Sequence, residues 1–597
     1  MKSEEFVGYA LLGVVGIITI VSVASFSKRL GIAAPLILVV LGIGGSYLPG
    51  FPANFSVSPE IILIGLLPPL LYSAAINVPI VDLRRNLNSI GALSVVLVVA
   101  SAFITGSILF FIFPHLNYAA AIALGAVISP TDAVAATSLG KRLGLPARLI
   151  TILEGESLVN DATALVLLRS SVAAAAALVS GVMTQSVWSV AGDFAYSVIV
   201  AIITGLLIGF VTVSLRSKLR DPVLDTAISF AVPFIAFIPA EKLNASGVLA
   251  VVVAGLYAGH KSARHSTAQA RISEKLNWRT AQFVLENGVF LLMGLQIRNI
   301  VESVSTSKFH DFSALDAILI GLLMTAVIIV IRFLFVGPLL LWLRRHNEQR
   351  ERSNRRFAAA LERVRHRRNQ DDRLRRRRKR AEKIYNRRAT DLTQLREEGL
   401  GWKGGVILSW SGMRGVVTLA AAQSLPSDGR FPYRPQLILV AFTVAIASLL
   451  IQGGTLPLLI RRSGIRGPDR DADRRELAAL LETMSAAGIE VLENPDFDLP
   501  GDDTVDVSVV ERVRHDTLLA AESAWERANH GTDDAALVDS PHQQYRSLRR
   551  EVLQAERQAL LDARSEGTYP SRILARAQSM LDLEETRLEQ IDNPGRS

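Results

Sequence analysis

Long apolar stretches recur along the chain between residues 6 and 460, and short polar segments separate them. A helix of roughly 20 mainly apolar residues crosses the hydrocarbon core of a bilayer, so each stretch predicts a membrane span. The pattern therefore indicates an all-α polytopic membrane protein. We predict thirteen spans, at residues 6–26, 31–48, 58–76, 88–113, 118–139, 149–178, 188–214, 225–240, 246–259, 279–298, 312–343, 403–424 and 436–460.

The chain after residue 460 has a different pattern. Residues 461–597 contain no apolar stretch long enough to span, and we expect a mainly helical regulatory tail there, separate from a transmembrane domain over 1–460. Within the tail, residues 494–508 predict a linker, and residues 545–590 predict a helical hairpin. The apolar faces expected in this hairpin are Leu548, Val552 and Ala555, and Ile573, Ala577, Met580 and Leu581.

The distribution of basic residues predicts the orientation. Alternate connections are rich in Lys and Arg, whereas the loops at 113–117 and 301–311 hold few of them. Because cytoplasmic loops are enriched in Lys and Arg, we expect the N-terminus outside the plasma membrane and the tail in the cytoplasm. The start, MKSEEF, carries two glutamates, which is unlike a secretion signal, so we expect the first apolar stretch to remain as a helix.

Two cytoplasmic segments differ strongly in charge. The predicted insert 344–402 is basic, with 21 Lys and Arg against 9 Asp and Glu up to residue 398, whereas the tail has 18 Arg against 28 Asp and Glu. Both can be solvated segments. They can also dock on each other, or the insert can dock on anionic membrane lipid, at about 1 kcal/mol per basic residue near the surface. Nucleic acid is not an expected partner, because no aromatic pattern accompanies the arginines.

The sixth predicted span carries carboxylates where they are costly. It reads ILEGESLVNDATALV and contains Glu154, Glu156 and Asp161. A charge at the bilayer centre costs at least ~2.5–3.5 kcal/mol, so such a residue is a functional-site candidate. At about 100° per residue, Ser157 lies on one helix face with Glu154 and Asp161, and Asn160 lies beside Glu156. Oxygen ligands of this kind suit a proton or a hard cation.

Two other spans each contain a break. Span five reads ISPTDAVA, in which Pro130 removes an amide donor, and Thr131 and Asp132 are suited to begin a second half-helix. Span twelve reads SGMRGVVTLA, where two glycines flank Arg414, which we expect to balance the negative ends of half-helices. Interrupted helices at corresponding places in two halves indicate an inverted-repeat transporter. A simple proline kink capped by Asp132 is the alternative for span five.

Arg332 is a further charge within an apolar stretch, in predicted span eleven. We expect it to pair with Glu156 or Glu154, because a buried charge is retained where an opposite charge neutralises it. A purely structural pairing with an arginine is therefore the alternative to a functional role for these carboxylates.

Taken together, these stretches resemble the monovalent cation:proton antiporter-1 family of bacterial sodium/proton antiporters and animal sodium/proton exchangers. The resemblance extends over about residues 6–460, and it implies two crossing broken helices, a separate dimerisation domain, a homodimer and alternating access. The matching segments are LLPPLLYSAA (66–75), ISPTDAVA (128–135), EGESLVNDATALV (154–166), SGVLAVVVAGL (246–256), RFLFV (332–336) and SGMRGVVTLA (411–420).

The resemblance also implies roles for individual residues. Asp161 would bind the proton and the cation in turn, and Ser157 and the Thr131 carbonyl would be further ligands of the transported metal ion. Asn160 and Asp132 would steady the crossing.

Two more implications concern charge. Glu156 and Arg332 would form a supporting ion pair. The Asn160–Asp161 pair is the one found in electroneutral members, which implies one proton for each cation. Ser73 stands where many animal exchangers have a glutamate, which leaves Asp161 as the obvious titrating ligand.

The resulting prediction is a secondary active antiporter rather than an enzyme, exchanging Na+ for H+ in pH and sodium homeostasis without a cofactor. Exchange of K+ or Li+ is the alternative within the same fold, since these ions are also hard and monovalent. A channel would need a selectivity filter, which is not evident. An intramembrane hydrolase using Asp132 and Asp161 is the alternative from another class. The absence of cysteine excludes disulfides, zinc–thiolate sites and thiol catalysis.

Overall fold

The structure is a computed structural model, and it describes residues 3–30, 33–49, 51–179, 187–219, 221–265, 268–307, 311–365, 400–426, 431–465, 467, 470–493 and 541–566, with parts of 380–392, 508–525 and 577–585. Over this part of the chain the regular structure is helical and contains no strand. Internal contacts define two units, Met1–Gly467 and Pro468–Ser597, and each is described by itself.

Helices occupy the ranges that the sequence predicts as spans. Among the described residues, seven helices are long and apolar enough to cross a membrane, and shorter apolar helices cover other predicted ranges. The all-helical membrane fold is therefore confirmed, while the count of thirteen spans stays a prediction. The long helices lie within Leu87–Ile112, Ala147–Ala177, Gly192–Arg216, Pro222–Lys242, Ala270–Ser305, Ala314–Arg356 and Arg434–Ser463.

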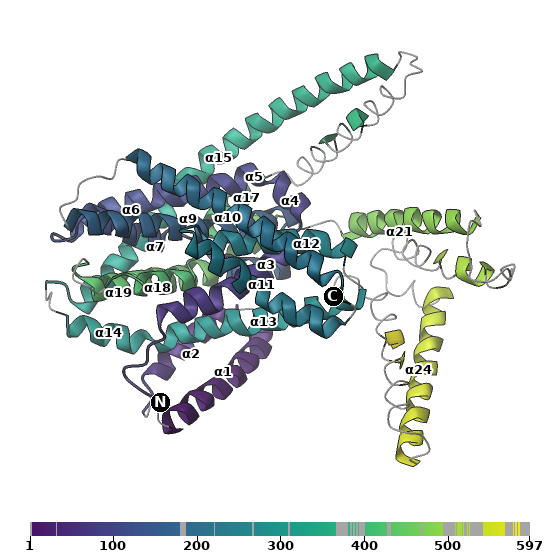
Figure 1. The fold of residues 1–597 in the computed structure, drawn as a ribbon, viewed down its shortest axis with the longest axis horizontal. Coiled ribbons are helices and arrows are strands. Elements are labelled where there is room, and N and C mark those ends of the chain that lie inside the picture. Colours follow the sequence, from purple (N-terminus) through teal and green to yellow (C-terminus); the bar gives the residue numbers. More distant parts are fainter. Residues whose placement is uncertain are drawn as a thin grey trace. The chain divides into compact units, whose positions relative to one another are not determined.

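The first unit is a bundle in which neighbouring helices in space come from distant parts of the sequence (Figure 1). Its helices are α1 (Ser3–Leu30), α2 (Ala34–Ser46), α3 (Leu67–Asn77), α4 (Ile80–Arg85), α5 (Leu87–Gly91), α6 (Val98–Ile112), α7 (Tyr118–Ile128), α8 (Val134–Leu143), α9 (Ala147–Val179), α10 (Val187–Arg216), α11 (Pro222–Lys242), α12 (Gly247–His265), α13 (Ala268–Leu295), α14 (Ile297–Ser305), α15 (Ala314–Arg365), α17 (Trp402–Trp410), α18 (Val416–Gln423), α19 (Arg434–Ser448) and α20 (Gly454–Ser463).

Both predicted breaks are present. Span five divides into α7 and α8, separated by residues 129–133, and span twelve divides into α17 and α18, separated by residues 411–415. Pro130 lies in the first gap, where it removes one amide donor. Three π-helical segments, Ile61–Leu66, Ala92–Leu97 and Leu449–Gly453, interrupt other spans. Irregular backbone at membrane depth is tolerated where protein buries it, and π-helical turns are frequent near functional sites.

Helix α9 lies between two apolar cores. Leu153 and Leu168 belong to a core shared with α7, α15 and α19, whereas Leu158 and Ala162 belong to a second core shared with α3, α11 and α12. The residues between Leu158 and Ala162 are therefore placed where the two cores meet. This arrangement positions the polar part of the helix inside the bundle.

The outer surface of the bundle is apolar where helices face away from it. On α10, the side chains of Ile199, Ile203, Leu207 and Phe210 are exposed and share one helix face. A continuous apolar face without protein cover is suited to lipid. The structure thus agrees with insertion of the first unit in a membrane.

The second unit contains α21 (Arg470–Glu493) and α24 (Pro541–Glu566). Arg549 and Arg557 of α24 form ion pairs with Glu584 and Glu585, so α24 contacts the later part of the predicted hairpin. The apolar face expected from the sequence is wrong, because Leu548, Val552 and Met580 are exposed, whereas Leu553 is buried. The contact uses the face that carries Leu553 and the two arginines, which are four residues on either side of it. Of the predicted linker 494–508, only Ser508 lies within the described residues.

Candidate cation and proton site

The two broken helices cross at their gaps. The backbone amide of Asp132 donates a hydrogen bond of 2.7 Å to the carbonyl of Met413. The backbone amide of Arg414 donates one of 2.9 Å to Ser448 Oγ, at the end of α19. Backbone groups that the breaks release therefore bond one another or a neighbouring helix, which removes the cost of leaving them unpaired inside a membrane.

Arg414 stabilises the crossing by donating hydrogen bonds to backbone carbonyls. Its guanidinium is buried and donates to the carbonyls of Ile128 (3.2 Å), Ser129 (3.4 Å) and Gly412. The first two carbonyls belong to the C-terminal end of α7, where helical partners are missing and the helix dipole is negative. The sequence predicted this placement of a positive charge at a half-helix C-terminus.

Glu156 and Arg332 form a bidentate ion pair. Their side-chain atoms are 2.5 and 2.8 Å apart, and each residue is only 1% exposed. Arg332 Nε also donates to the carbonyl of Leu408 (3.1 Å), near the C-terminal end of α17. Thr131 Oγ1 donates to Glu156 Oε1 (2.9 Å). The pair thus links α9 and α15 to both broken helices, and it satisfies a buried carboxylate that would otherwise be very costly.

Gly412 and Gly415, which flank Arg414, lie where other side chains approach the backbone too closely for a Cβ atom. A Cβ atom at Gly412 would lie 2.6 Å from Arg332 Cδ, and one at Gly415 would lie 2.6 Å from Asp132 Cβ. Both separations are shorter than real Cβ contacts. The sequence indicated that the glycines let the helix open, and the structure adds that they let Arg332 and Asp132 pass beside the open segment.

Asn160 fixes the first gap to α9. Its Nδ2 atom donates to the Thr131 carbonyl (2.9 Å) and to Thr131 Oγ1 (2.8 Å). The carbonyl that the resemblance assigned to the cation therefore already accepts one hydrogen bond. Asn160 Oδ1 is buried and has no hydrogen-bond partner in the part of the chain that the structure describes. The residue thus steadies the crossing and also presents a free acceptor within the bundle.

Asp161 lies next to this crossing and is 7% exposed. None of the residues that the structure describes donates a hydrogen bond to its carboxylate or forms an ion pair with it. One turn away, Ser157 Oγ accepts a hydrogen bond of 3.4 Å from the amide of Ala133, in the first gap. The structure thus places Ser157 and Asn160 in contact with the first gap, with Asp161 beside Asn160 on α9. That these residues bind the transported ions stays a prediction.

The remaining two carboxylates have structural partners. Asp132 Oδ1 accepts from the amide of Val134 (2.8 Å) and so caps the start of α8. Glu154 pairs with Lys141 at the end of α8 (2.8 Å), and its side chain is 26% exposed. Glu154 therefore does not share the buried environment of Asp161, although both lie on one helix.

The sequence interpretation missed a second buried charge cluster. Arg216 bonds both carboxylate oxygens of Asp225 (2.8 and 2.7 Å) and lies 2.8 Å from Glu274, and all three residues are buried. The cluster joins α10, α11 and α13. Arg216 and Glu274 lie in predicted connections, where charges are ordinary, so the pattern along the chain gave no signal for burial.

Comparison with known proteins gives the family. Residues 16–462 match the family described as "Sodium/hydrogen exchanger, transmembrane". A Mycobacterium tuberculosis protein named as an uncharacterized Na+/H+ exchanger is 28% identical, and the alignment covers 98% of this chain and 97% of that protein. The Na+/H+ antiporter ApNhaP of Aphanothece halophytica is also 28% identical, over 79% of this chain and 76% of its own length.

Two further proteins bear on the transported ions and on the fold. A sodium, potassium, lithium and rubidium/H+ antiporter of Bacillus subtilis is 28% identical over 75% of this chain and 61% of its own length. The solved structure of the sodium proton antiporter MjNhaP1 from Methanocaldococcus jannaschii superposes with a TM-score of 0.54 at 16% identity, covering 78% of this chain and all of that one. The structural likeness shows a shared fold. Since the family match covers most of the chain, this protein belongs to the family of transmembrane sodium/hydrogen exchangers.

Proposed function

We propose that this family member exchanges Na+ for H+ and that Asp161 binds the two ions in turn. The observation that carries the proposal is the contrast between two buried carboxylates on α9. Glu156 is neutralised by Arg332, whereas Asp161 has no hydrogen bond or ion pair among the described residues. A buried carboxylate without a partner is stable when it holds a proton or a cation.

The neighbouring oxygens support binding of a cation at the same place. The neutral oxygens here are of the kind that hard cations prefer: Ser157 Oγ, the Thr131 carbonyl, and Asn160 Oδ1, which no described residue bonds. A single carboxylate among neutral ligands balances one monovalent charge. We therefore propose a stoichiometry of one cation for one proton.

The cycle follows from this exchange. Asp161 would release its proton on one side of the membrane, take a cation there, and release that cation on the other side. Movement of the crossed helices between two positions would give access to each side in turn. The proposed location is the plasma membrane, with the N-terminus outside, the tail inside as a regulatory domain, and a homodimer as the working form.

Exchange of K+ is a second candidate. The Bacillus subtilis relative is named for sodium, potassium, lithium and rubidium. The ligands proposed here are all oxygens and do not distinguish these ions by type. Since the family consists of transporters, the hydrolase alternative is not retained.

The test is transport by the purified protein in liposomes. Asp161→Asn should abolish exchange, because an amide holds neither the proton nor the negative charge that attracts the cation. Glu302→Gln is a control, since Glu302 is paired with Arg298 on the helix surface. Sodium and potassium are added separately to liposomes that contain a pH-sensitive dye. If Asp161→Asn still dissipates a pH gradient on addition of either ion, Asp161 is not the exchange site.

A further inference from the structure

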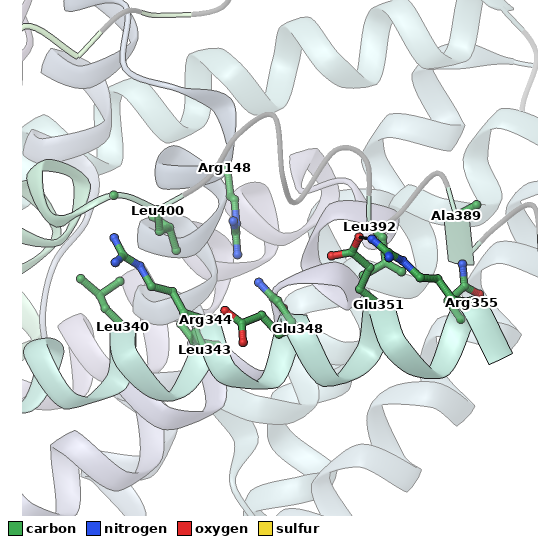
Figure 2. Close-up of a pocket in the computed structure, with 13 residues that line it drawn as sticks. Arg148, Leu340, Leu343, Arg344, Glu348, Glu351, Arg355, Ala389, Leu392 and Leu400 are labelled. Carbon is green, nitrogen blue, oxygen red and sulfur yellow. Dashed lines mark hydrogen bonds and ion pairs between the residues drawn. The ribbon is translucent and has the colours of Figure 1, made fainter. Parts of the chain in front are cut away.

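A large cavity lies away from the crossing, beside the long helix α15. Its volume is about 760 Å³, which is within the usual range of roughly 300–1,000 Å³ for small-ligand sites. Figure 2 shows Arg344, Glu348, Glu351 and Arg355 rising from α15 into the cavity, with Arg148 coming down from the opposite wall. Arg148 stands at the start of α9, so the cavity is bounded by two helices of the bundle.

The cavity lies where α15 leaves the apolar zone. The helix is apolar from Phe333 to Leu343 and rich in charge from Arg344 onward, and both parts belong to one continuous helix (Figure 1). Trp342 and Trp402 are exposed at this level. Tryptophan is enriched where a membrane meets water, so these residues place the cavity at the depth of lipid head groups.

The lining has a polar and an apolar side. Arg148, Arg344, Arg355, Asn347 and Asn354 supply hydrogen-bond donors. Leu340, Leu343, Leu392 and Leu400 supply the apolar side. A ligand that fits such a lining carries both an anionic group and a hydrocarbon part.

The charge of the cavity favours an anion. Three arginines and two glutamates line it, which leaves one net positive charge, and Glu351 is already paired with Arg355 at 2.7 Å. Residues 344–356 of α15 hold six arginines against two glutamates. Arginine forks match phosphate oxygens in geometry as well as in charge.

A second cavity provides room for acyl chains nearby. This groove of about 660 Å³ lies between α5 and α15, and Leu87, Ala92, Phe335, Pro338 and Leu339 are among its mainly apolar lining. One hydrogen bond joins the walls of the two cavities. Arg148 Nε donates to Asn86 Oδ1 (3.0 Å), and Asn86 is the neighbour of Leu87 in the groove.

From these observations we propose that the cavity between α9 and α15 binds the phosphate head group of an anionic phospholipid. The arginines would hold the phosphate, and the adjacent groove would take an acyl chain. Basic pockets between helices at the cytoplasmic surface are known to be suited to such head groups. The lipid would bridge the start of α9 and the extension of α15. Further along the same two helices lie Asp161 on α9 and Arg332 on α15. The inference concerns binding and does not depend on which ion is transported.

The test compares two matched pairs of substitutions in the full-length protein. R344Q/R355Q removes two lining arginines that lie eleven residues apart on one face of α15. R345Q/R356Q removes two arginines with the same spacing, turned by about 100° from that face and outside the lining. All four side chains are exposed, so both variants should fold. Binding of short-chain phosphatidylglycerol is measured by native mass spectrometry, with phosphatidylcholine for comparison.

The expected result is tighter binding of phosphatidylglycerol than of phosphatidylcholine to the unchanged protein. R344Q/R355Q should weaken phosphatidylglycerol binding by about tenfold or more, and R345Q/R356Q by about threefold or less, since each basic residue near a head group contributes on the order of 1 kcal/mol. Equal losses in the two variants would show general attraction and overturn the proposed pocket. Inorganic phosphate that displaces phosphatidylglycerol at an equal concentration would show that the acyl chains add nothing, identify a soluble phosphate compound as the ligand and overturn the lipid.

Discussion

At the scale of single residues, the partner of a buried charge decides its role. Glu156 and Asp161 lie five positions apart on α9 and are both buried. Glu156 accepts hydrogen bonds from Arg332 and Thr131, which supply partners for both of its carboxyl oxygens. Asp161 has no comparable donors among the described residues. A chain can thus place two carboxylates in one span and give a structural role to one and a proposed transport role to the other.

The Glu156–Arg332 pair gives a prediction on stability. Removing either partner leaves a buried charge without compensation, which costs roughly 3–5 kcal/mol in buried pairs. Glu156→Ala and Arg332→Ala should each lower the yield of folded protein and its thermal midpoint in detergent. The double variant should recover part of both, because no unpaired charge remains. Equal behaviour of the three variants in a thermal unfolding series would contradict this account of the pair.

At the scale of elements, the broken helices are held by side chains from other helices. Arg414 bonds the end of α7, and Arg332 bonds the end of α17. Each arginine therefore replaces the helical hydrogen bonds that the breaks remove. Two buried arginines thus stabilise the crossing, one at the C-terminal end of α7 and the other near the C-terminal end of α17.

The close approach at Gly412 gives a prediction for this scale. Gly412→Ala adds one methyl group against Arg332, which must then move away from Glu156 or from the Leu408 carbonyl. Overpacking of this kind costs typically about 1–3 kcal/mol, and weakening of the ion pair would add to it. The thermal midpoint of the purified variant is the measurement.

Gly337→Ala is the matched control for Gly412→Ala. It lies on α15, where an added Cβ meets nothing within 4 Å. A variant at Gly412 as stable as the one at Gly337 would show that Arg332 can be displaced without cost.

Much of this architecture could be predicted from the sequence, since its causes are local. Pro130 and the glycines around Arg414 mark the breaks, and charged residues in apolar stretches mark the buried pair. The cluster of Arg216, Asp225 and Glu274 could not be predicted, because burial there results from packing of three helices that are distant in the sequence. The exposed face of α24 was misread for a similar reason, as the contact of that helix is made with ion pairs as well as apolar residues.

At the scale of the whole molecule, the charge that moves in each cycle is the quantity to measure. Under the proposed mechanism, Asn160 is neutral and Glu156 is paired, so only Asp161 would change its bound ion and one cation would replace one proton. The rate of sodium-driven proton movement in liposomes should then be unchanged when the membrane potential is clamped at different values. A sustained current on addition of sodium would mean that a second carboxylate also exchanges protons.

The Glu156–Arg332 ion pair also has a consequence for the order of synthesis. Glu156 and Arg332 are 176 positions apart in the sequence, so Glu156 leaves the ribosome long before Arg332 has been synthesised. At about 5–20 residues per second, the delay is on the order of 10–35 s. During this interval the carboxyl group of α9 has to stay near water or remain neutral, because nothing yet compensates its charge. This ion pair can therefore form only after α15 has been made, so the environment of α9 in the newly made chain is completed by a helix synthesised much later.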